Sequence, residues 1–343
     1  MSRPRILVAH AWMKGNLGDV LQLSVLLSAL RELEPQTLDL AGYPARPAPA
    51  TADVLALADR YLADPFPRYW SLLPTGVGGA LIERQWTRRR RRLFSRYDAL
   101  VCAPGPYLAE YDPRAVSALC DIAVAAELGL PVVLASHSIG PLDERGLAAV
   151  RRATVRISRE PATHRYLCGR GVSSVLSADL AFLYPYRNVN GAGPIDPPYR
   201  LVFLRSNNVD ARRLRVAQGK LFEGTRLIAD GEREQLVLAT SDTRRDAGFL
   251  ARVARALRLP LVACRSVGEL VRLISHSSGV VSDRYHPAIC AAVLGKPALV
   301  LQNREPHKME GLQNLLADNS VEELQRLARV GLDTIRGTLR TSI

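Results

Sequence analysis

The chain of 343 residues is poor in cysteine, and its five cysteines follow no recognisable pattern. They are odd in number, never spaced as Cys-x-x-Cys, and mostly lie in or beside apolar runs: Cys102, Cys120, Cys168, Cys264 and Cys290. This usage excludes a disulfide framework of the kind found in small secreted folds. We expect reduced, mostly buried thiols in a cytoplasmic protein.

Motifs of the common enzyme classes are also missing. The six histidines are isolated, without a His-x-x-x-His pair, so their spacing indicates no metal site. The sequence has no Gly-x-Ser-x-Gly elbow, no P-loop and no Gly-x-Gly-x-x-Gly fingerprint. Any chemistry must therefore rest on cations, an imidazole and carboxylates.

Long apolar runs are lacking as well. No segment approaches the roughly 20 uncharged residues of a membrane span. The apolar stretch 6–11 near the N-terminus is too short for a signal peptide and is predicted to be a first strand instead.

Acidic residues are outnumbered, with 33 Asp and Glu against 46 Lys and Arg, which gives a net charge of +13 and a pI near 10.0. This balance favours a polyanionic partner or an anionic surface. Five consecutive arginines, residues 88–92, lie in a predicted helix, and the first interpretation is a solvated helix face. A sharper alternative is docking on anionic lipid head groups at the inner face of the membrane. Nucleic acid ranks third, because no recognised DNA or RNA module accompanies the run.

The composition is that of a globular protein, and the length favours two domains. Apolar runs of strand length alternate with helical patterns. In the first half we predict strands at 6–11, 38–40, 99–103, 132–135 and 155–158, and helices at 19–33, 51–62, 79–96, 113–128, 143–153 and 161–168. Alternation of this kind predicts a parallel sheet with helices on both faces.

Residues 185–199 are rich in Pro and Gly, which predicts a linker. A polar and basic helical region is then predicted to about residue 229. The alternation restarts, with strands at 201–204, 236–239, 261–263, 280–282 and 299–301 and helices at 243–257, 266–276 and 286–294. We predict two facing, doubly wound Rossmann-like α/β domains: an N-terminal one over 1–184 and a C-terminal one with C-terminal helices over 200–343. The cleft between them would hold the site.

The clearest functional signal follows the strand that ends at Ser282. This strand delivers Arg284 and His286 to a helix N-terminus, where backbone N–H groups and the helix dipole favour anions. The next short strand places Lys308 beside the same spot. Two cations, a titratable imidazole and a helix N-terminus suit a small substrate that bears a phosphate and a carboxylate.

The turn after the first strand contains Gly15, Asn16 and Gly18 and ends at Asp19. Its glycines would let backbone amides approach a ligand, and Asp19 is a natural N-cap. A purely structural turn explains the same residues equally well, because Gly, Asn and Asp are favoured in turns for local reasons.

Other predicted strand ends carry Gly105, His137, Ser138 and Arg159, at the edge where open α/β sheets bind ligands. His137 could contact a ligand or donate a proton, although a satisfied structural histidine is the commoner explanation. Arg159 could clamp a carboxylate or simply pair with Glu160, and spacing does not choose between these roles.

Six sequence blocks, taken in order, resemble the polysaccharide pyruvyl transferase family. They are residues 15–19, the turn around Gly105, 138–141, 158–160 with Thr163, 177–182, and 282–286 continuing through 295–297 to Lys308. The resemblance covers about residues 5–320. The chain departs from the family pattern with His137 in place of Gln, Glu160 in place of Asp and Thr163 in place of Ser, and with prolines beside Gly105.

The resemblance implies a GT-B-like transferase that moves the enolpyruvyl group of phosphoenolpyruvate onto a sugar, glycan or lipid-linked saccharide. The product would be a pyruvate ketal, formed with release of phosphate and without a metal or organic cofactor. His286 is the best-placed acid, because histidine titrates near neutral pH. The residues assigned to catalysis are His286, Arg284 and Asp19, and those assigned to substrate binding are Gly15, Asn16, Gly18, Gly105, His137, Ser138, Arg159, Arg205, Ser282 and Lys308.

Two other classes stay open on the sequence alone. A GT-B-type glycosyltransferase that uses a nucleotide sugar would also need a cationic strand end between two α/β domains. A non-catalytic homologue that binds glycan or anionic lipid is the second, but the intact Arg284, His286 and Lys308 argue against it. The sequence names neither the acceptor, nor the regiochemistry of the ketal, nor the oligomeric state.

Overall fold

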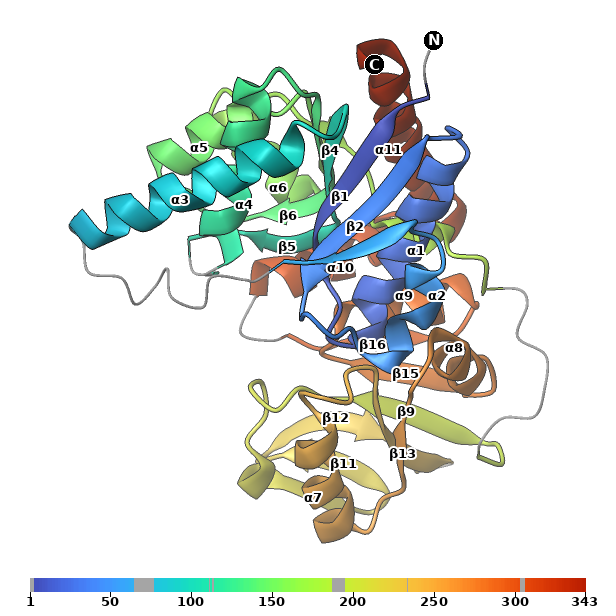
Figure 1. The fold of residues 1–343 in the computed structure, drawn as a ribbon. Coiled ribbons are helices and arrows are strands. Elements are labelled where there is room, and N and C mark those ends of the chain that lie inside the picture. Colours follow the sequence, from blue (N-terminus) through green and yellow to red (C-terminus); the bar gives the residue numbers. More distant parts are fainter. Residues whose placement is uncertain are drawn as a thin grey trace.

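The computed structural model places two α/β units one above the other, with the first half of the chain forming the upper unit (Figure 1). The residues it describes are 3–64, 77–110, 112, 114–186, 195–232, 234–302 and 306–343, except for the side chains of 77–83 and 306–308.

The upper unit is built on an eight-stranded parallel sheet in the order β3-β2-β1-β4-β6-β7-β8, with β5 paired to β6. Its strands are β1 (Arg5–Trp12), β2 (Thr37–Tyr43), β3 (Arg60–Ala63), β4 (Ala99–Cys102), β5 (Gly105–Leu108), β6 (Val132–Ile139), β7 (Val155–Ser158) and β8 (Val175–Leu176). Its helices are α1 (Leu17–Arg31), α2 (Ala52–Leu55), α3 (Val77–Phe94), α4 (Arg114–Glu127), α5 (Glu144–Arg151) and α6 (Pro161–Gly169). The central strands are apolar on both faces because helices cover both sides of the sheet.

The lower unit has a five-stranded parallel sheet in the order β14-β13-β9-β15-β16. Its strands are β9 (Tyr199–Phe203), β13 (Gln235–Thr240), β14 (Leu261–Ala263), β15 (Gly279–Ser282) and β16 (Ala298–Val300), and its helices are α7 (Ala247–Leu257), α8 (Val267–Ser275) and α9 (Tyr285–Val293). The predicted class of two α/β units with parallel sheets is confirmed.

Two predicted helices are wrong. Within the region 51–62, α2 ends at Leu55 and the edge strand β3 begins at Arg60. The basic region before residue 229 is a three-stranded antiparallel sheet: β10 (Leu214–Ala217), β11 (Lys220–Glu223) and β12 (Arg226–Asp230). Its first hairpin turns at Gln218 and Gly219, which both have positive φ, as two-residue hairpin loops require.

Part of the predicted linker 185–199 lies outside the described residues, namely 187–194. The linker ends before residue 199, because Tyr199 is the first residue of β9 and pairs with β13.

The C-terminal helix α11 (Val321–Ser342) runs back to the upper unit, where it contacts α1, β6, β7 and β8 (Figure 1). It follows α10 (Pro306–Asp318) and begins with a capping box between Ser320 and Glu323. Its backbone accepts a hydrogen bond at Leu327 from the Ser177 hydroxyl, 3.0 Å away. Although we grouped α11 with residues 200–343, it packs on elements of the first half of the chain.

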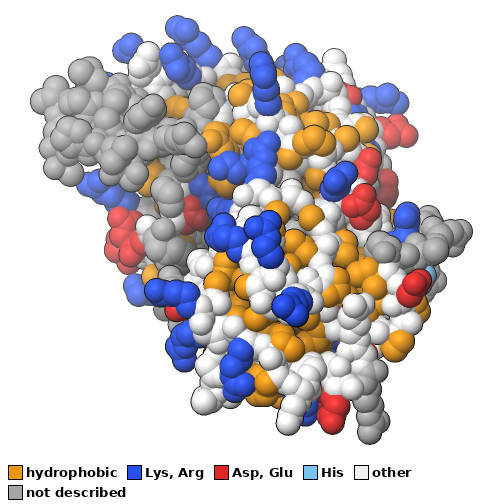
Figure 2. Space-filling model, turned by 90° about the horizontal axis from the view of Figure 1, so that it is seen from below, with side chains coloured by type: hydrophobic (Ala, Val, Ile, Leu, Met, Phe, Trp, Pro, Cys, Tyr) orange, Lys and Arg blue, Asp and Glu red, His pale blue; other side chains and the backbone are white. Residues whose placement is uncertain are grey.

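The five arginines 88–92 on α3 do not behave alike. Arg88, Arg89, Arg91 and Arg92 are exposed, as a solvated face requires, but Arg90 is buried. On the underside of the molecule, Lys and Arg side chains are spread out rather than gathered into one patch (Figure 2). Among the described helices, none combines the length and apolarity needed to cross a membrane.

The packing of α11 predicts a difference between two of its residues. Ile335 is completely buried and Val330 is 45% exposed. Ile335→Ala should lower the free energy of unfolding by about 2–5 kcal/mol, because it leaves a cavity, whereas Val330→Ala should change it by less than about 0.5 kcal/mol. Urea denaturation of the two variants measures this. Equal effects would contradict the docking of α11 on the core.

Candidate active site

A polar cleft lies between the two units. It opens at the carboxyl ends of β9 and β15, neighbouring strands from which the chain winds outward in opposite directions. Open α/β sheets bind ligands at such a switch point. Beside it, the backbone N–H of Leu17 donates to the carbonyl of Ser241 over 2.9 Å, so the start of α1 is joined to the lower sheet.

Four arginines line this cleft, and each follows a strand of one sheet or opens a helix: Arg114, Arg205, Arg245 and Arg284. Among the lining residues that the structure describes, the acidic side chains are Asp19 and Asp283. The excess of positive charge favours a ligand with more than one negative group.

Arg284 is held by carboxylates as well as facing the cleft. It forms a salt bridge with Asp246 and lies 3.6 Å from Asp242, both nearly buried. Burial lowers the pKa of Arg284 to about 10, so it stays charged at neutral pH. Its positive charge is partly compensated in this structure.

Asp283 supports the loop that carries Arg205. Its carboxylate accepts hydrogen bonds from the backbone N–H of Arg205 over 3.0 Å and from the side-chain amide of Asn208 over 3.1 Å. Burial raises the pKa of Asp283 to about 6, against the lowering effect of these donors. The loop after β9 is therefore fixed to the end of β15.

His286 is the second residue of α9 and lines the cleft. Its Nε2 lies 2.7 Å from the side-chain nitrogen of Gln22 and 3.7 Å from Asp179 Oδ2. Because Gln22 Oε1 accepts from Arg159, 3.3 Å away, the Gln22 amide directs its NH₂ group at His286. This arrangement favours the imidazole tautomer with its proton on Nδ1.

Gly18 makes room for this imidazole. A Cβ at residue 18 would lie 1.9 Å from His286 Nδ1, far inside the contact distance. Glycine is therefore required here by close approach. Gly15 is required for another reason, since its φ of +91° is a conformation that other residues rarely adopt.

Arg159 lies beneath the cleft and does not line it. It is fully buried, pairs with Asp179 over 2.9 Å and donates to the Ser138 hydroxyl over 2.7 Å. Its guanidinium also lies 4.8 Å from the ring centre of Tyr285. Burial tends to raise the pKa of Asp179, but His286 and Arg159 hold it below its usual value. The contacts among Arg159, Asp179 and Gln22 thus hold the His286 imidazole in place from the protein interior.

The remaining predicted residues fall into two groups. Asn16 and Asp19 line the cleft, and the Asn16 side chain caps α1 by accepting from the Gly18 N–H over 3.1 Å. Three others lie away from the cleft lining: Gly105, His137 and Ser282.

His137 is fully buried, and its Nε2 lies 2.9 Å from the Tyr107 hydroxyl. Burial lowers its pKa to about 3, as expected of a structural histidine. The Ser282 hydroxyl accepts from the N–H of Arg284 over 2.9 Å and so shapes the turn into α9. Lys308 belongs to α10, but its side chain lies outside the described residues.

Sequence reasoning missed several residues of the cleft: Trp12, Arg114, Ser241, Arg245 and Tyr285. A usable signal existed for Arg245, because it follows the end of β13 at the same edge of the sheet as Arg205 and Arg284. No such signal marked Gln22, which is on an apolar helix and reaches His286 only through the fold.

Known structures share this architecture. The putative UDP-N-acetylglucosamine 2-epimerase of Listeria monocytogenes aligns over 99% of this chain and 97% of its own, with a TM-score of 0.60 and 13% identity. The UDP-GlcNAc 2-epimerase of Neisseria meningitidis, solved with UDP-GlcNAc, aligns over 98% of this chain and 100% of its own, with a TM-score of 0.53 and 11% identity. At such low identity these likenesses show the fold alone, which is GT-B-like.

The sequence matches no curated protein. The model of one family, described as polysaccharide pyruvyl transferase, does match, over residues 16–305. That match spans most of the chain, including α1, most of the cleft lining and α9, and it confirms the resemblance found in the sequence. The chain belongs to the polysaccharide pyruvyl transferase family and is a transferase.

Proposed function

We propose that the cleft binds phosphoenolpyruvate and that the protein transfers its enolpyruvyl carbons to a sugar or glycan acceptor as a pyruvate ketal. The observation that carries this proposal is the set of four arginines gathered around His286 at the switch point of the lower sheet. Phosphoenolpyruvate bears a phosphate and a carboxylate a few ångströms apart, so it needs separated cationic contacts. Arg205, Arg245 and Arg284 offer them from three neighbouring strand ends.

The reaction balances without any added reagent. A first acceptor hydroxyl adds to C2 of the donor while C3 gains a proton and becomes a methyl group. The C2–O bond to phosphate then breaks, and a second hydroxyl adds at C2 to close the ketal. Of the two hydroxyl protons, one replaces the proton given to C3 and the other leaves with the phosphate.

In this scheme His286 delivers the proton to C3. In the imidazolium form the Nε2 proton would have Asp179, 3.7 Å away, as its acceptor in place of the contact with the Gln22 amide, and the arginines would stabilise the departing phosphate. Donor and phosphate are both held by the lower unit, next to the N-terminus of α9.

Mass spectrometry of saccharides incubated with the protein and phosphoenolpyruvate tests the proposal. We expect a product with the mass of a pyruvate ketal, together with released phosphate. Transfer of a sugar from a nucleotide sugar in a parallel incubation, with no use of phosphoenolpyruvate, would instead assign the protein to glycosyl transfer.

Replacing the proposed acid gives the first prediction for this site. His286→Gln keeps hydrogen bonding to Gln22 but cannot deliver a proton, so turnover should fall by at least about 100-fold with little change in the affinity for phosphoenolpyruvate. Steady-state kinetics and calorimetry measure the two quantities. If more than about a tenth of the turnover survives, His286 is not the acid.

A second prediction uses the close approach at Gly18. Gly18→Ala should displace the imidazole of His286 and lower turnover by about 10-fold or more, since small misplacements of a catalytic group are costly. Gly248→Ala on α7 is the matched control, because nothing lies within 4 Å of a Cβ added there. Equal turnover in both variants would show that the position of His286 does not matter.

A third prediction concerns the donor's anionic groups. Arg205→Gln should weaken phosphoenolpyruvate binding by about 10–100-fold, because a charged hydrogen bond contributes about 1.5–3 kcal/mol. Arg252→Gln, on the exposed face of α7, removes the same charge outside the cleft and should leave the affinity unchanged. Calorimetric titration of both variants is the measurement. Unaltered binding in Arg205→Gln would place the donor elsewhere.

A further inference from the structure

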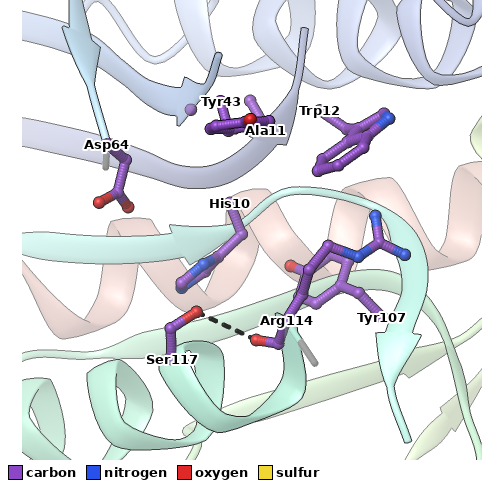
Figure 3. A pocket seen from close by; sticks show the side chains of 9 residues that line it. His10, Ala11, Trp12, Tyr43, Asp64, Tyr107, Arg114 and Ser117 are labelled. Carbon is purple, nitrogen blue, oxygen red and sulfur yellow. Dashed lines mark hydrogen bonds between the residues drawn. The ribbon is translucent and has the colours of Figure 1, made fainter. Parts of the chain in front are cut away.

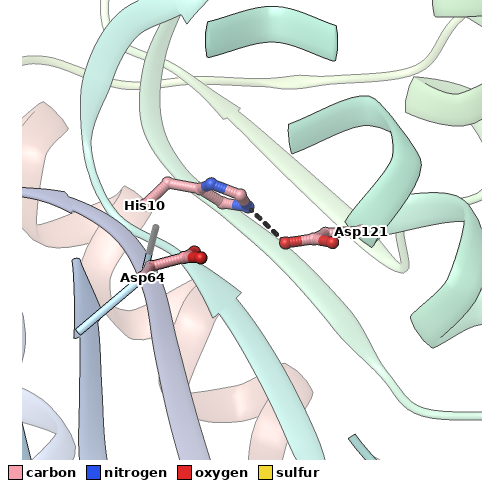
Figure 4. A group of neighbouring side chains, drawn as sticks. All are labelled: His10, Asp64 and Asp121. Atoms are coloured by element: carbon pink, nitrogen blue, oxygen red, sulfur yellow. Dashed lines mark ion pairs between the residues drawn. The ribbon is translucent and has the colours of Figure 1, made fainter. Parts of the chain in front are cut away.

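A cluster of buried polar side chains lies in the upper unit, outside the lining of the cleft. His10 of β1, Asp64 directly after β3 and Asp121 of α4 meet there (Figure 4). Their side chains are 8%, 10% and 0% exposed. The family match and the sequence motifs assign no role to these residues, which come together only in the fold.

Polar atoms in this cluster lack hydrogen-bond partners among the described residues. They include His10 Nε2, Asp64 Oδ1 and both carboxylate oxygens of Asp121. His10 Nε2 and Asp121 Oδ2 lie 3.4 Å apart without forming a hydrogen bond. Because buried polar groups nearly always have a partner, a group of such atoms points to a water molecule or an ion between them.

We propose that this cluster binds a divalent metal ion, with His10, Asp64 and Asp121 as ligands and zinc as the best fit. Zinc accepts imidazole nitrogen together with carboxylate oxygen, whereas magnesium and calcium prefer oxygen ligands alone. The inference does not depend on the proposed function, because none of the three ligands lines the cleft assigned to the donor.

The spacing of the ligand atoms suits zinc. Bonds of about 2.0–2.2 Å in a tetrahedral site place neighbouring ligand atoms about 3.3–3.6 Å apart. The 3.4 Å between His10 Nε2 and Asp121 Oδ2 matches this value. Ligand atoms of all three residues lie within 4.8 Å of one another, so a small inward movement of Asp64 would complete the set. The pocket in front of His10 and Asp64 has room for only a water molecule or two, which suits a fourth ligand (Figure 3).

Arg90 holds both carboxylates from outside the cluster. Its Nη2 lies 2.5 Å from Asp64 Oδ2, and its Nε lies 2.9 Å from Asp121 Oδ1. These ion pairs use one oxygen of each carboxylate and leave Asp64 Oδ1 and Asp121 Oδ2 to serve as ligands. Carboxylates that bind metals are commonly oriented in this way by an outer donor. The other cation near the imidazole, Arg114, is paired with Asp112.

The charges of the cluster also favour a cation. Two carboxylates face one guanidinium, and His10 adds no charge at neutral pH because burial lowers its pKa to about 4. Burial raises the pKa of Asp121 to about 7, although Arg90 acts to lower it. Arg90 therefore does not compensate both carboxylates, and a buried surplus of negative charge is costly. A divalent ion would supply the missing positive charge, and the neutral imidazole is the form that binds metals.

His10 is held in an unusual backbone conformation. Its φ is +65°, in the left-handed region, where the pairing of β1 with β2 shifts register between Val8 and Ala11. A non-glycine residue in this region costs free energy, and such residues gather at functional sites. A bound ion would tie this bulge to the end of β3 and to α4, two residues before Trp12, which lines the cleft.

The test is zinc binding by the full chain without a histidine tag. After dialysis against EDTA, the wild type should bind about one zinc ion per chain in competition with a chromophoric chelator, and excess magnesium should not displace it. His10→Gln should weaken the Kd for zinc by about 100-fold or more, since outer groups alone change metal affinity by about 10–100-fold. His276→Gln is the matched control, because this histidine contacts the Arg272 carbonyl at the end of α8, and it should keep the wild-type Kd.

Thermal denaturation is a second measurement, and it also shows whether His10→Gln is folded. Zinc should raise the midpoint of the wild type and of His276→Gln, because a ligand of the native state stabilises it, and should leave His10→Gln unchanged.

Two results would overturn the inference. Failure of the wild type to bind zinc, by titration and by thermal shift, would leave the cluster as a buried ion pair. Equal zinc affinity in the wild type and His10→Gln would place the metal elsewhere on the chain. Since no measurement here uses phosphoenolpyruvate, either result would leave the proposed function standing.

Discussion

The position of His286 depends on a buried ion pair between Arg159 and Asp179, 2.9 Å apart and without exposure to solvent. Burying two charges is costly unless each is paired and hydrogen-bonded. Here Gln22 and Ser138 accept further hydrogen bonds from Arg159, and Asp179 lies 3.7 Å from the imidazole. The five elements involved come from both units: α1, β6, the end of β7, the turn at Asp179, and α9. The network therefore joins the units and aims the histidine in one arrangement, and breaking the pair would cost about 3–5 kcal/mol.

The two units contribute different side chains to the cleft. The lower sheet brings its strand ends, with Arg205, Arg245 and Arg284, to one side of the cleft. The upper unit contributes Trp12, Asp19 and Arg114 to the lining of the same cleft. The return of α11 to the upper unit supports the same relative placement of the units.

The sequence predicted the central parallel strands well, because a strand covered on both faces must be apolar throughout. The prediction failed for strands that are buried on one face only. The residues from Leu214 to Glu223 alternate as a hairpin around Gln218 and Gly219, yet their many basic residues suggested a helix. At the site, His286 and Arg284 were found because they follow a strand end. Residues such as Gln22, Arg90 and Asp121 escaped notice, because only the fold brings them to their partners.

The most direct test of the account is a crystal structure of the protein with phosphoenolpyruvate. The account predicts that the phosphate and carboxylate lie within hydrogen-bonding distance of arginines among Arg205, Arg245 and Arg284, with C3 of the donor facing His286. Phosphoenolpyruvate bound outside this cleft would contradict it.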